Sequence, residues 1–308
     1  MKEKNSENSE FRSGFVSIVG KPNAGKSTLL NRLMGQPIAG VSAKPQTTRK
    51  RQLGILTTDK AQIIFVDTPG LHEPKDRLSQ FINSEAEFAL RDADVLLFTA
   101  DGAGRPDEMD GKLANLIKEV APKVPVLMLV NKSDAVTGNV FQTNRLAYEK
   151  LLPEARVLAI SAQTGEGVTH LLDVLSEMLP IGPAYYPEDQ VTETFEREIA
   201  AEMIRSACMT YLSDEVPYSI AVRVNEYTER ETGLIYINAT IFVEREAQKA
   251  IVIGKGGEKI KQIGSAARAD IEKMNGQKVF LETAVKARRD WKNDPAFLKE
   301  LGLTQGKE

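Results

Sequence analysis

Short apolar runs alternate with amphipathic stretches along the first 180 residues of the chain. The runs are rich in Val, Ile and Leu and are bounded by Gly, Pro, Asn or Asp: Phe15–Val19, Ile63–Val66, Val95–Thr99, Val126–Val130 and Val157–Ile160. Helix-length segments lie between them: Leu78–Leu90, Asp107–Val120, Phe141–Leu151 and Val168–Leu179. This alternation predicts an α/β fold, a mixed, mostly parallel sheet with helices on both faces. The less apolar Arg51–Thr58 is expected to pair with Ile63–Val66 as an antiparallel edge strand.

A proline-rich stretch, Pro180–Pro187, interrupts this pattern. Its three prolines and one glycine exclude a helix interior and suit a semi-rigid linker. We therefore expect a disordered leader at 1–13, an α/β domain at 14–180, a linker at 181–192 and a second domain at 193–308.

The second domain has a different order of elements. One helical face is predicted over Glu193–Leu212, followed by two strand-like runs, a glycine-rich loop, a helix and a strand. The segments after the first helix are Ser219–Asn225, Leu234–Val243, Glu258–Met274 and Lys278–Thr283. This order predicts an α+β domain.

Composition adds a charge asymmetry. The net charge is −3, yet Arg245–Lys292 contains 12 Lys/Arg and 6 Asp/Glu, so that stretch carries +6 and the remainder −9. The single cysteine, Cys208, excludes an intrachain disulfide, and its helical spacing predicts a small buried side chain. No secretory apolar region and no apolar run of about 18–20 residues is visible. We expect a cytosolic protein, with weak peripheral membrane contact left open.

The first motif that carries chemistry is a phosphate-binding loop. Gly20-x₄-Gly25-Lys26-Ser27 follows a predicted strand and opens a predicted helix, the context that a P-loop requires. Its N–H groups would surround a β-phosphate, Lys26 would bridge the β- and γ-phosphates, and Ser27 would bind Mg²⁺. The residues expected to bind are Gly20, Lys21, Pro22, Asn23, Ala24, Gly25, Lys26, Ser27 and Thr28.

A second motif, Asp67-Thr68-Pro69-Gly70, ends the strand Ile63–Val66. Carboxyl ends of strands in such a sheet face the ligand crevice. Asp67 is therefore predicted to hold Mg²⁺ through water, and the Gly70 N–H to meet the γ-phosphate.

Asn131-Lys132-Ser133-Asp134 selects the base. The Asp134 carboxylate can accept from N1–H and the 2-amino group of guanine, whereas adenine has no such amino group; sites of this kind discriminate by roughly 10⁴-fold or more. Asn131 would brace the loop, the Lys132 stem would lie along the base, and the Ala162 N–H, beside Ser161, would reach guanine O6. The sequence therefore predicts GTP and GDP as ligands.

The loop Gln36–Lys50 is expected to act as a switch. A GTPase needs a threonine that reaches Mg²⁺ and the γ-phosphate; Thr48 is favoured, with Thr47 as the alternative. The predicted catalytic groups are then Lys26, Thr48 and Gly70, and the predicted metal ligands are Ser27, Thr48 and Asp67.

Leu71 stands where Ras-like GTPases carry the glutamine that orients water, so slow hydrolysis is expected. Backbone, magnesium, potassium or a partner would have to assist. Asn23 is a candidate potassium ligand, and His72 is read as a surface histidine.

A downstream signal points to RNA. Gly254-Lys255-Gly256-Gly257 lies between apolar Ala250–Ile253 and a predicted helix, as in a KH module that clamps single strands on a glycine loop. Arg288, Arg289, Trp291 and Lys292 could extend this surface, although Trp291 could equally be a core anchor. The expected RNA-binding residues are Ile253, Gly254, Lys255, Gly256, Gly257, Lys259, Lys261, Arg288 and Arg289.

The combined motifs resemble the bacterial Era family. The resemblance rests on the G-domain motifs, Pro45–Arg49, Asp67–His72, Asp214–Tyr218 and Val252–Gly257, and it covers nearly the whole chain after the leader. It implies a P-loop NTPase of the Ras-like G-domain type followed by a type II KH domain. It further implies slow GTP hydrolysis, binding to the 3′ end of 16S ribosomal RNA, assistance to 30S subunit maturation and some peripheral contact with the inner membrane. We expect a monomer. The alternative is an RNA-binding protein in which GTP is mainly a structural ligand.

Overall fold

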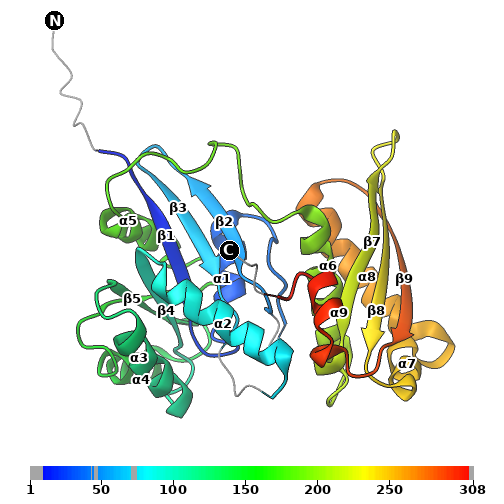
Figure 1. Cartoon of the computed structure of the whole chain (residues 1–308). Helices are drawn as coiled ribbons and strands as arrows, with labels where there is room; N and C mark the ends of the chain where they lie inside the picture. Colours follow the sequence, from blue (N-terminus) through cyan, green and yellow to red (C-terminus); the bar gives the residue numbers. More distant parts are fainter. Residues whose placement is uncertain (1–9, 43, 45–47, 71–74, 305–308) are drawn as a thin grey trace, which may run out of the picture.

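The computed structural model describes residues 10–42, 44, 48–70 and 75–304. The chain forms two lobes joined by an extended linker, with the first lobe built on one sheet and the second on another (Figure 1). This arrangement confirms the α/β and α+β halves that the sequence pattern predicts.

The first lobe is a six-stranded sheet in the order β2-β3-β1-β4-β5-β6. Its strands are β1 (Arg12–Val19), β2 (Gln52–Thr57), β3 (Ala61–Asp67), β4 (Val95–Asp101), β5 (Val126–Asn131) and β6 (Arg156–Ala159). Only β2 runs antiparallel to its neighbour within this sheet, as the less apolar run Arg51–Thr58 predicts. The helices are α1 (Lys26–Met34), α2 (Arg77–Arg91), α3 (Glu108–Val120), α4 (Gly138–Glu149) and α5 (Val168–Met178).

Two apolar layers bury the faces of this sheet. α1 and α5 cover one face, where Leu29, Leu30 and Leu171 are fully buried. α3 and α4 cover the other face, with Leu113 and Tyr148 in its core and the end of α2 beside them. Because both faces are covered, the strands read as nearly continuous apolar runs.

The second lobe contains α6 (Glu196–Tyr211), η1 (Pro217–Ser219), β7 (Ala221–Glu229), β8 (Ile235–Val243), α7 (Glu246–Ile253), η2 (Lys255–Gly257), α8 (Glu258–Asn275) and β9 (Val279–Ala287). Its sheet has the order β7-β8-β9; β8 runs antiparallel to β7 and parallel to β9. α6 and α8 pack on one face around Cys208, which is fully buried as expected. The helix–strand–strand–helix–helix–strand order is that of a type II KH domain.

Two boundaries differ from those expected. β1 begins at Arg12 rather than after a leader ending at residue 13, because the Arg12 N–H donates to Lys60 O at 3.1 Å and Arg12 forms a bridge with Ile181. β9 extends to Ala287, beyond the strand expected at Lys278–Thr283, because it pairs with β8 along its whole length.

The linker lies against the first lobe. The Gln62 side chain accepts from the N–H groups of Tyr185 and Tyr186, and Thr192 Oγ1 donates to Leu53 O at 2.6 Å. The semi-rigid character expected of this proline-rich stretch is therefore reinforced by hydrogen bonds to β2 and β3.

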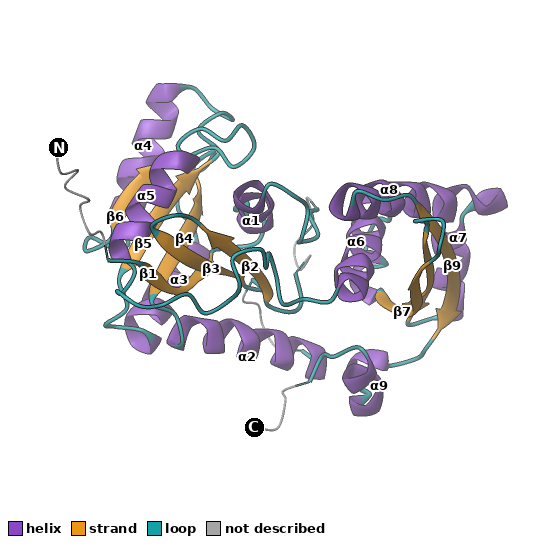
Figure 2. Cartoon of the chain, turned by 90° about the horizontal axis from the view of Figure 1, so that it is seen from above, coloured by secondary structure: helices purple, strands orange, loops and turns teal. Residues whose placement is uncertain are grey.

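The chain then returns to the first lobe through η3 (Trp291–Asn293) and α9 (Pro295–Glu300), which lies beside the N-terminal end of α2 (Figure 2). Apolar side chains from both lobes meet there in one buried cluster: Leu78, Phe81, Ile82, Ala221, Phe242, Trp291, Phe297, Leu298 and Leu303. We call this cluster the seam. Among the described residues, no helix is long and apolar enough to cross a membrane.

Candidate functional site

The phosphate-binding loop lies between β1 and α1, as predicted. Gly25 has a φ of 100°, and a Cβ there would lie 2.2 Å from Asn131 Nδ2, so glycine is required for both backbone and space. Lys26 is buried, and its ammonium donates to Gly20 O at 2.8 Å and to Lys21 O at 3.1 Å. Burial lowers the pKa of Lys26, while the nearby Asp67 carboxylate opposes that shift.

Three predicted metal ligands converge beside this loop. Ser27 Oγ donates to Asp67 Oδ2 at 2.6 Å, and Thr48 Oγ1 lies 3.1 Å from Ser27 Oγ and 3.3 Å from Asp67 Oδ2. Asp67 is fully buried, and its Oδ1 has no hydrogen-bond partner among the described residues. Burial is the main cause that raises the pKa of Asp67. A buried carboxylate with an unsatisfied oxygen and two hydroxyl groups alongside is an oxygen ligand set that fits Mg²⁺.

Of the two candidate threonines, Thr48 is the one that the described structure brings to this cluster. The alternative, Thr47, lies outside the described residues, as do Leu71 and His72. The choice between the two threonines stays a prediction, although the geometry favours Thr48.

A cavity of about 300 Å³ joins the phosphate loop to the other motifs. Its lining combines the four separate regions that the sequence predicts to meet: Pro22, Asn23, Gly25, Lys26, Ser27, Thr28, Gly40, Val41, Ser42, Lys44, Thr48, Thr68, Gly70 and Lys132. Gly70 lies close to the phosphate loop, since a Cβ on it would be 3.2 Å from Pro22 Cγ.

The base-recognition loop is held by Asn131 at the end of β5. Its Nδ2 donates to Ala24 O at 2.8 Å, and its Oδ1 accepts from the Ala162 N–H at 2.9 Å. The bracing role predicted for Asn131 is visible in these contacts. The Ala162 N–H, predicted to meet guanine O6, is bonded here to Asn131, and the Asp134 side chain is exposed.

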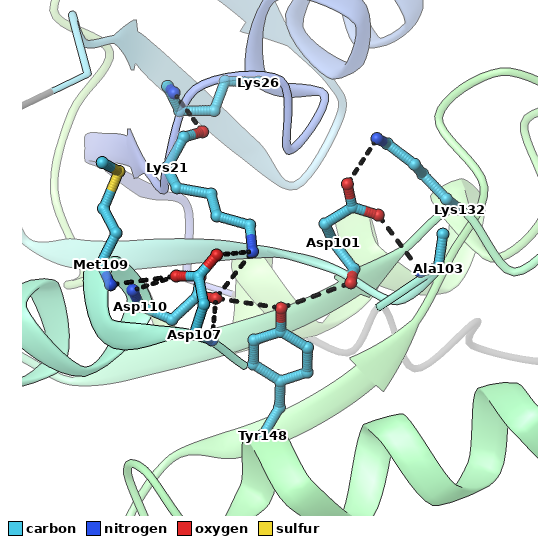
Figure 3. Close-up of polar contacts among 9 residues, drawn as sticks. All are labelled: Lys21, Lys26, Asp101, Ala103, Asp107, Met109, Asp110, Lys132 and Tyr148. Atoms are coloured by element: carbon cyan, nitrogen blue, oxygen red, sulfur yellow. Dashed lines mark hydrogen bonds and ion pairs between the residues drawn. The ribbon is translucent and has the colours of Figure 1, made fainter. Parts of the chain in front are cut away.

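Lys21 was expected among the nucleotide contacts, but its side chain points to the opposite side of the loop. Its ammonium donates to Asp107 Oδ2 and Asp110 Oδ2, both at 2.8 Å (Figure 3). Burial opposes protonation, yet the two carboxylate hydrogen bonds raise the pKa of Lys21. Only the backbone of Lys21 remains available to a phosphate.

Sequence reasoning missed a polar chain behind the site. Tyr148 Oη lies 3.2 Å from Asp110 Oδ2 and 3.3 Å from Asp101 O, and Asp101 Oδ2 accepts from Lys132 Nζ at 2.7 Å (Figure 3). These contacts connect the phosphate loop, through Lys21, to the base-recognition loop. The pair Asp107 and Asp110 forms a capping box at the start of α3, which is a local pattern that could have been found.

The glycine loop of the second lobe is exposed between α7 and α8. Gly254, Gly256 and Gly257 all have positive φ values, and nothing lies within 4 Å of a Cβ built on Gly256. Ile253 beside the loop is 38% exposed, and Lys255 and Lys261 are exposed, while Lys259 is half-buried. The expected apolar and cationic groups therefore surround a loop that is open to a ligand backbone.

Three of the four residues after β9 that could have extended the RNA surface are buried or paired within the protein. Trp291 is fully buried, and its Nε1–H donates to Ser219 O at 2.9 Å. Of the two roles considered for Trp291, an RNA contact and a core anchor, the structure therefore shows the core anchor. Arg288 pairs with Asp294 at 2.7 Å, and Lys292 pairs with Glu244 at 3.3 Å. Arg289 is exposed.

Known protein families match both lobes of the chain. The family described as "50S ribosome-binding GTPase" matches residues 15–132, and a KH-domain family matches residues 215–292. The GTPase Era of Geobacter metallireducens is 46% identical over 295 residues, covering 96% of this chain and 98% of its own. That of Lactobacillus helveticus is 44% identical, covering 96% and 97%.

Two solved structures are similar over both lobes, each with a TM-score of 0.89 and 37% identity, covering 96% of this chain and 100% of the other. One is a single-residue variant of Aquifex aeolicus Era bound to GDP·AlF₄⁻; the other is Era with MgGDPNP and nucleotides 1506–1542 of 16S ribosomal RNA. Identity at this level, spanning the G domain, the KH domain and the segment that joins them, shows that the chain belongs to the Era family of GTPases.

Proposed function

We propose that the chain is a GTP-hydrolysing switch that binds the 3′ end of 16S ribosomal RNA and assists 30S subunit assembly and rRNA maturation. The main support for this proposal is that Thr48 lies within hydrogen-bond distance of Ser27 and Asp67. The same chain also has a glycine loop with open space around Gly256. A relative with 37% identity holds MgGDPNP together with a 16S rRNA fragment, which supports the same pair of ligands here.

The description of the matching G-domain family names the 50S subunit, whereas the solved relative holds RNA of the small subunit. We give the second observation more weight. The G-domain match ends at residue 132 and does not include the KH domain, which would contact the RNA.

Each residue of the site would have a separate role in GTP hydrolysis. Bound Mg²⁺ would be held by Ser27, Thr48 and Asp67, and it would neutralise charge on the β- and γ-phosphates. Lys26 would exchange its carbonyl partners in the loop for phosphate oxygens. Gly70, which lines the same cavity, would offer its N–H to the γ-phosphate. GTP turnover should therefore require both the loop and the switch threonine.

Hydrolysis is proposed to be slow because the Leu71 side chain cannot hydrogen-bond a water. Asn23, which lines the cavity in the left-handed conformation at φ 63°, is the candidate ligand for a potassium ion that would assist. Replacing K⁺ by Na⁺ at constant ionic strength should lower single-turnover hydrolysis. Equal rates in the two salts would remove potassium from the proposal.

A test of the switch compares RNA affinity in the two nucleotide states. The probe is an RNA of nucleotides 1506–1542 of 16S rRNA, and binding is measured with GDP and with a non-hydrolysable GTP analogue. A difference supports the switch. Equal affinities, together with single-turnover hydrolysis that RNA leaves unchanged, would favour the alternative in which GTP is structural.

Location and assembly complete the proposal. We expect a cytoplasmic monomer whose contact with the inner membrane is weak, and this expectation rests on the family resemblance. Sedimentation with anionic lipid vesicles tests membrane contact, and light scattering of the purified chain tests the monomer.

A further inference from the structure

Arg49, the residue after Thr48, belongs to the first lobe but is bound by the second. Its guanidinium donates from Nη1 to Ile220 O at 2.6 Å and from Nη2 to Tyr218 O at 3.3 Å. It also lies over the Trp291 ring, 5.4 Å from the centroid. All three partners lie beyond the linker, so the side chain crosses the boundary between the domains.

This placement of a cation is costly, which suggests a purpose beyond packing. Arg49 is 3% exposed, and among the described residues its Nε has no hydrogen-bond partner and no carboxylate forms an ion pair with it. Buried ionic groups are weak sources of stability compared with apolar side chains of similar size.

Helix α2, which follows the Asp67–Gly70 motif, also contributes side chains to the seam. α2 begins seven residues after Gly70, and its Leu78 packs in the cluster that contains Trp291. The Arg77 N–H donates to Asn293 Oδ1 at 3.2 Å. The segment that follows each of the two motifs expected to sense the γ-phosphate therefore contacts η3, which comes after β9: Arg49 lies over Trp291, and the Arg77 N–H donates to Asn293.

From the seam, contacts continue toward the glycine loop. Lys292, next to Trp291, pairs with Glu244 at 3.3 Å, and Glu244 lies just before α7. α7 ends at Ile253, immediately before Gly254. The C-terminal segment thus contacts Arg49 through Trp291 and contacts Glu244, just before α7, through Lys292.

We propose that Arg49 is a positioning residue that couples Thr48 at the metal site to Trp291 and the KH domain. Consecutive Cα atoms are about 3.8 Å apart, so a movement of Thr48 away from Ser27 and Asp67 also displaces the Arg49 backbone from which the guanidinium reaches the second lobe. Loss of the γ-phosphate releases Thr48, withdraws Arg49 from Trp291 and loosens the seam. This inference rests on the proposed function and assigns its coupling to one side chain.

The chain offers a direct reporter, because Trp291 is its single tryptophan. With the full chain, we expect Trp291 emission to lie at longer wavelength with GDP than with a non-hydrolysable GTP analogue and Mg²⁺. Arg49→Met should abolish this difference while still binding both nucleotides. Arg49→Lys, which keeps the charge but loses the two-pronged geometry, should restore little of it.

Arg51→Met is the matched control. Arg51 pairs with Glu85 at 2.8 Å and lies over Phe88, and both partners belong to α2 of the first lobe. This variant removes the same charge two residues away and should keep the emission difference. A wild-type-like response in Arg49→Met, or no response in the wild-type chain when both nucleotides bind, would overturn the proposal.

An RNA measurement separates this inference from the proposed function. The ratio of 16S rRNA 1506–1542 affinities in the two nucleotide states should be about 5–150-fold in the wild-type chain and near one in Arg49→Met. A ratio of one in the wild-type chain, together with a nucleotide-dependent emission shift that Arg49→Met removes, would overturn the RNA switch and support the coupling through Arg49.

Discussion

The two glycine loops of this protein are shaped by different neighbours. In the phosphate loop, a Cβ on Gly20 would lie 2.3 Å from Thr99 O and one on Gly25 2.2 Å from Asn131 Nδ2. In the KH loop, a Cβ on Gly256 meets nothing within 4 Å, and one on Gly257 meets only Ile260 Cγ2 at 4.0 Å. Gly20 and Gly25 are therefore required by the protein's own packing, and so is Gly254 at the start of the KH loop, where a Cβ would lie 2.6 Å from Lys259 Cβ. Gly256 and Gly257, in contrast, are required for their positive φ values and leave space for a partner. Substitutions should therefore damage the two loops in different ways.

The largest effect is expected from Asp134→Asn, which acts on base recognition rather than on loop shape. The amide would donate where guanine also donates, so GTP selectivity should fall by an amount on the order of 10⁴-fold. Xanthine nucleotides, which present an acceptor at that position, should bind instead. Competition between GTP, XTP and ATP against a fluorescent GDP provides the measurement, and retained guanine preference would refute the assignment of Asp134.

Gly25→Ala should be next in size. The new methyl group would displace Asn131, which braces both the phosphate loop and Ala162, so affinity for GDP and GTP should fall by about 100-fold. Gly35→Ala is the matched control, since Gly35 caps the other end of α1 with a φ of 68° and open space around it. It should lower stability by about 1 kcal/mol and leave nucleotide affinity intact. Equal losses in the two variants would mean that backbone strain alone is decisive.

Gly256→Asp tests the second loop. The side chain fits without a clash, but it places a negative charge where phosphates should approach, so RNA affinity should fall about tenfold, or about 1.4 kcal/mol. GTP hydrolysis should not change. Gly276→Asp, at a φ of 69° beyond α8, supplies a similar strain and charge away from the loop. If both variants weaken RNA binding equally, the effect comes from net charge and the glycine loop is not the contact.

The smallest effect is expected from Tyr148→Phe, which removes one hydroxyl from the chain behind the nucleotide site. A single hydrogen bond of about 1 kcal/mol corresponds to nucleotide affinity about fivefold lower. Tyr227→Phe, which removes a hydroxyl bonded to Glu196 at 2.6 Å in the other lobe, should leave nucleotide affinity unchanged. Calorimetry with GDP measures the affinity of each variant. Identical affinities in the two variants would show that the hydrogen bonds of Tyr148 do not support the nucleotide site.

Local patterns predict most of the fold and the core of the nucleotide site. The alternation of buried strands and amphipathic helices predicts the first lobe, because each strand is covered on both faces. The meeting of Ser27 and Asp67 follows from motif order, since the parallel strands β1 and β3 end at the same edge. Thr48 joins them because it precedes β2, whose first residue pairs with Asp67 in an antiparallel register.

Features that depend on contacts distant in sequence are not predictable in this way. The direction of Lys21 is set by two carboxylates of α3, and the role of Trp291 by Ser219 and the seam. The extra length of β9 likewise depends on its pairing with β8. No local periodicity encodes these partners, because each pair brings together segments of different elements.

The seam also has a consequence for how the molecule is made. η3 and α9 follow both lobes in the chain, yet they supply Trp291, Phe297 and Leu298 to the cluster that joins the lobes. During synthesis each lobe can complete its own core before these side chains emerge. Docking of the lobes is then the last step of maturation, and a nascent protein would bind nucleotide before its two halves can communicate.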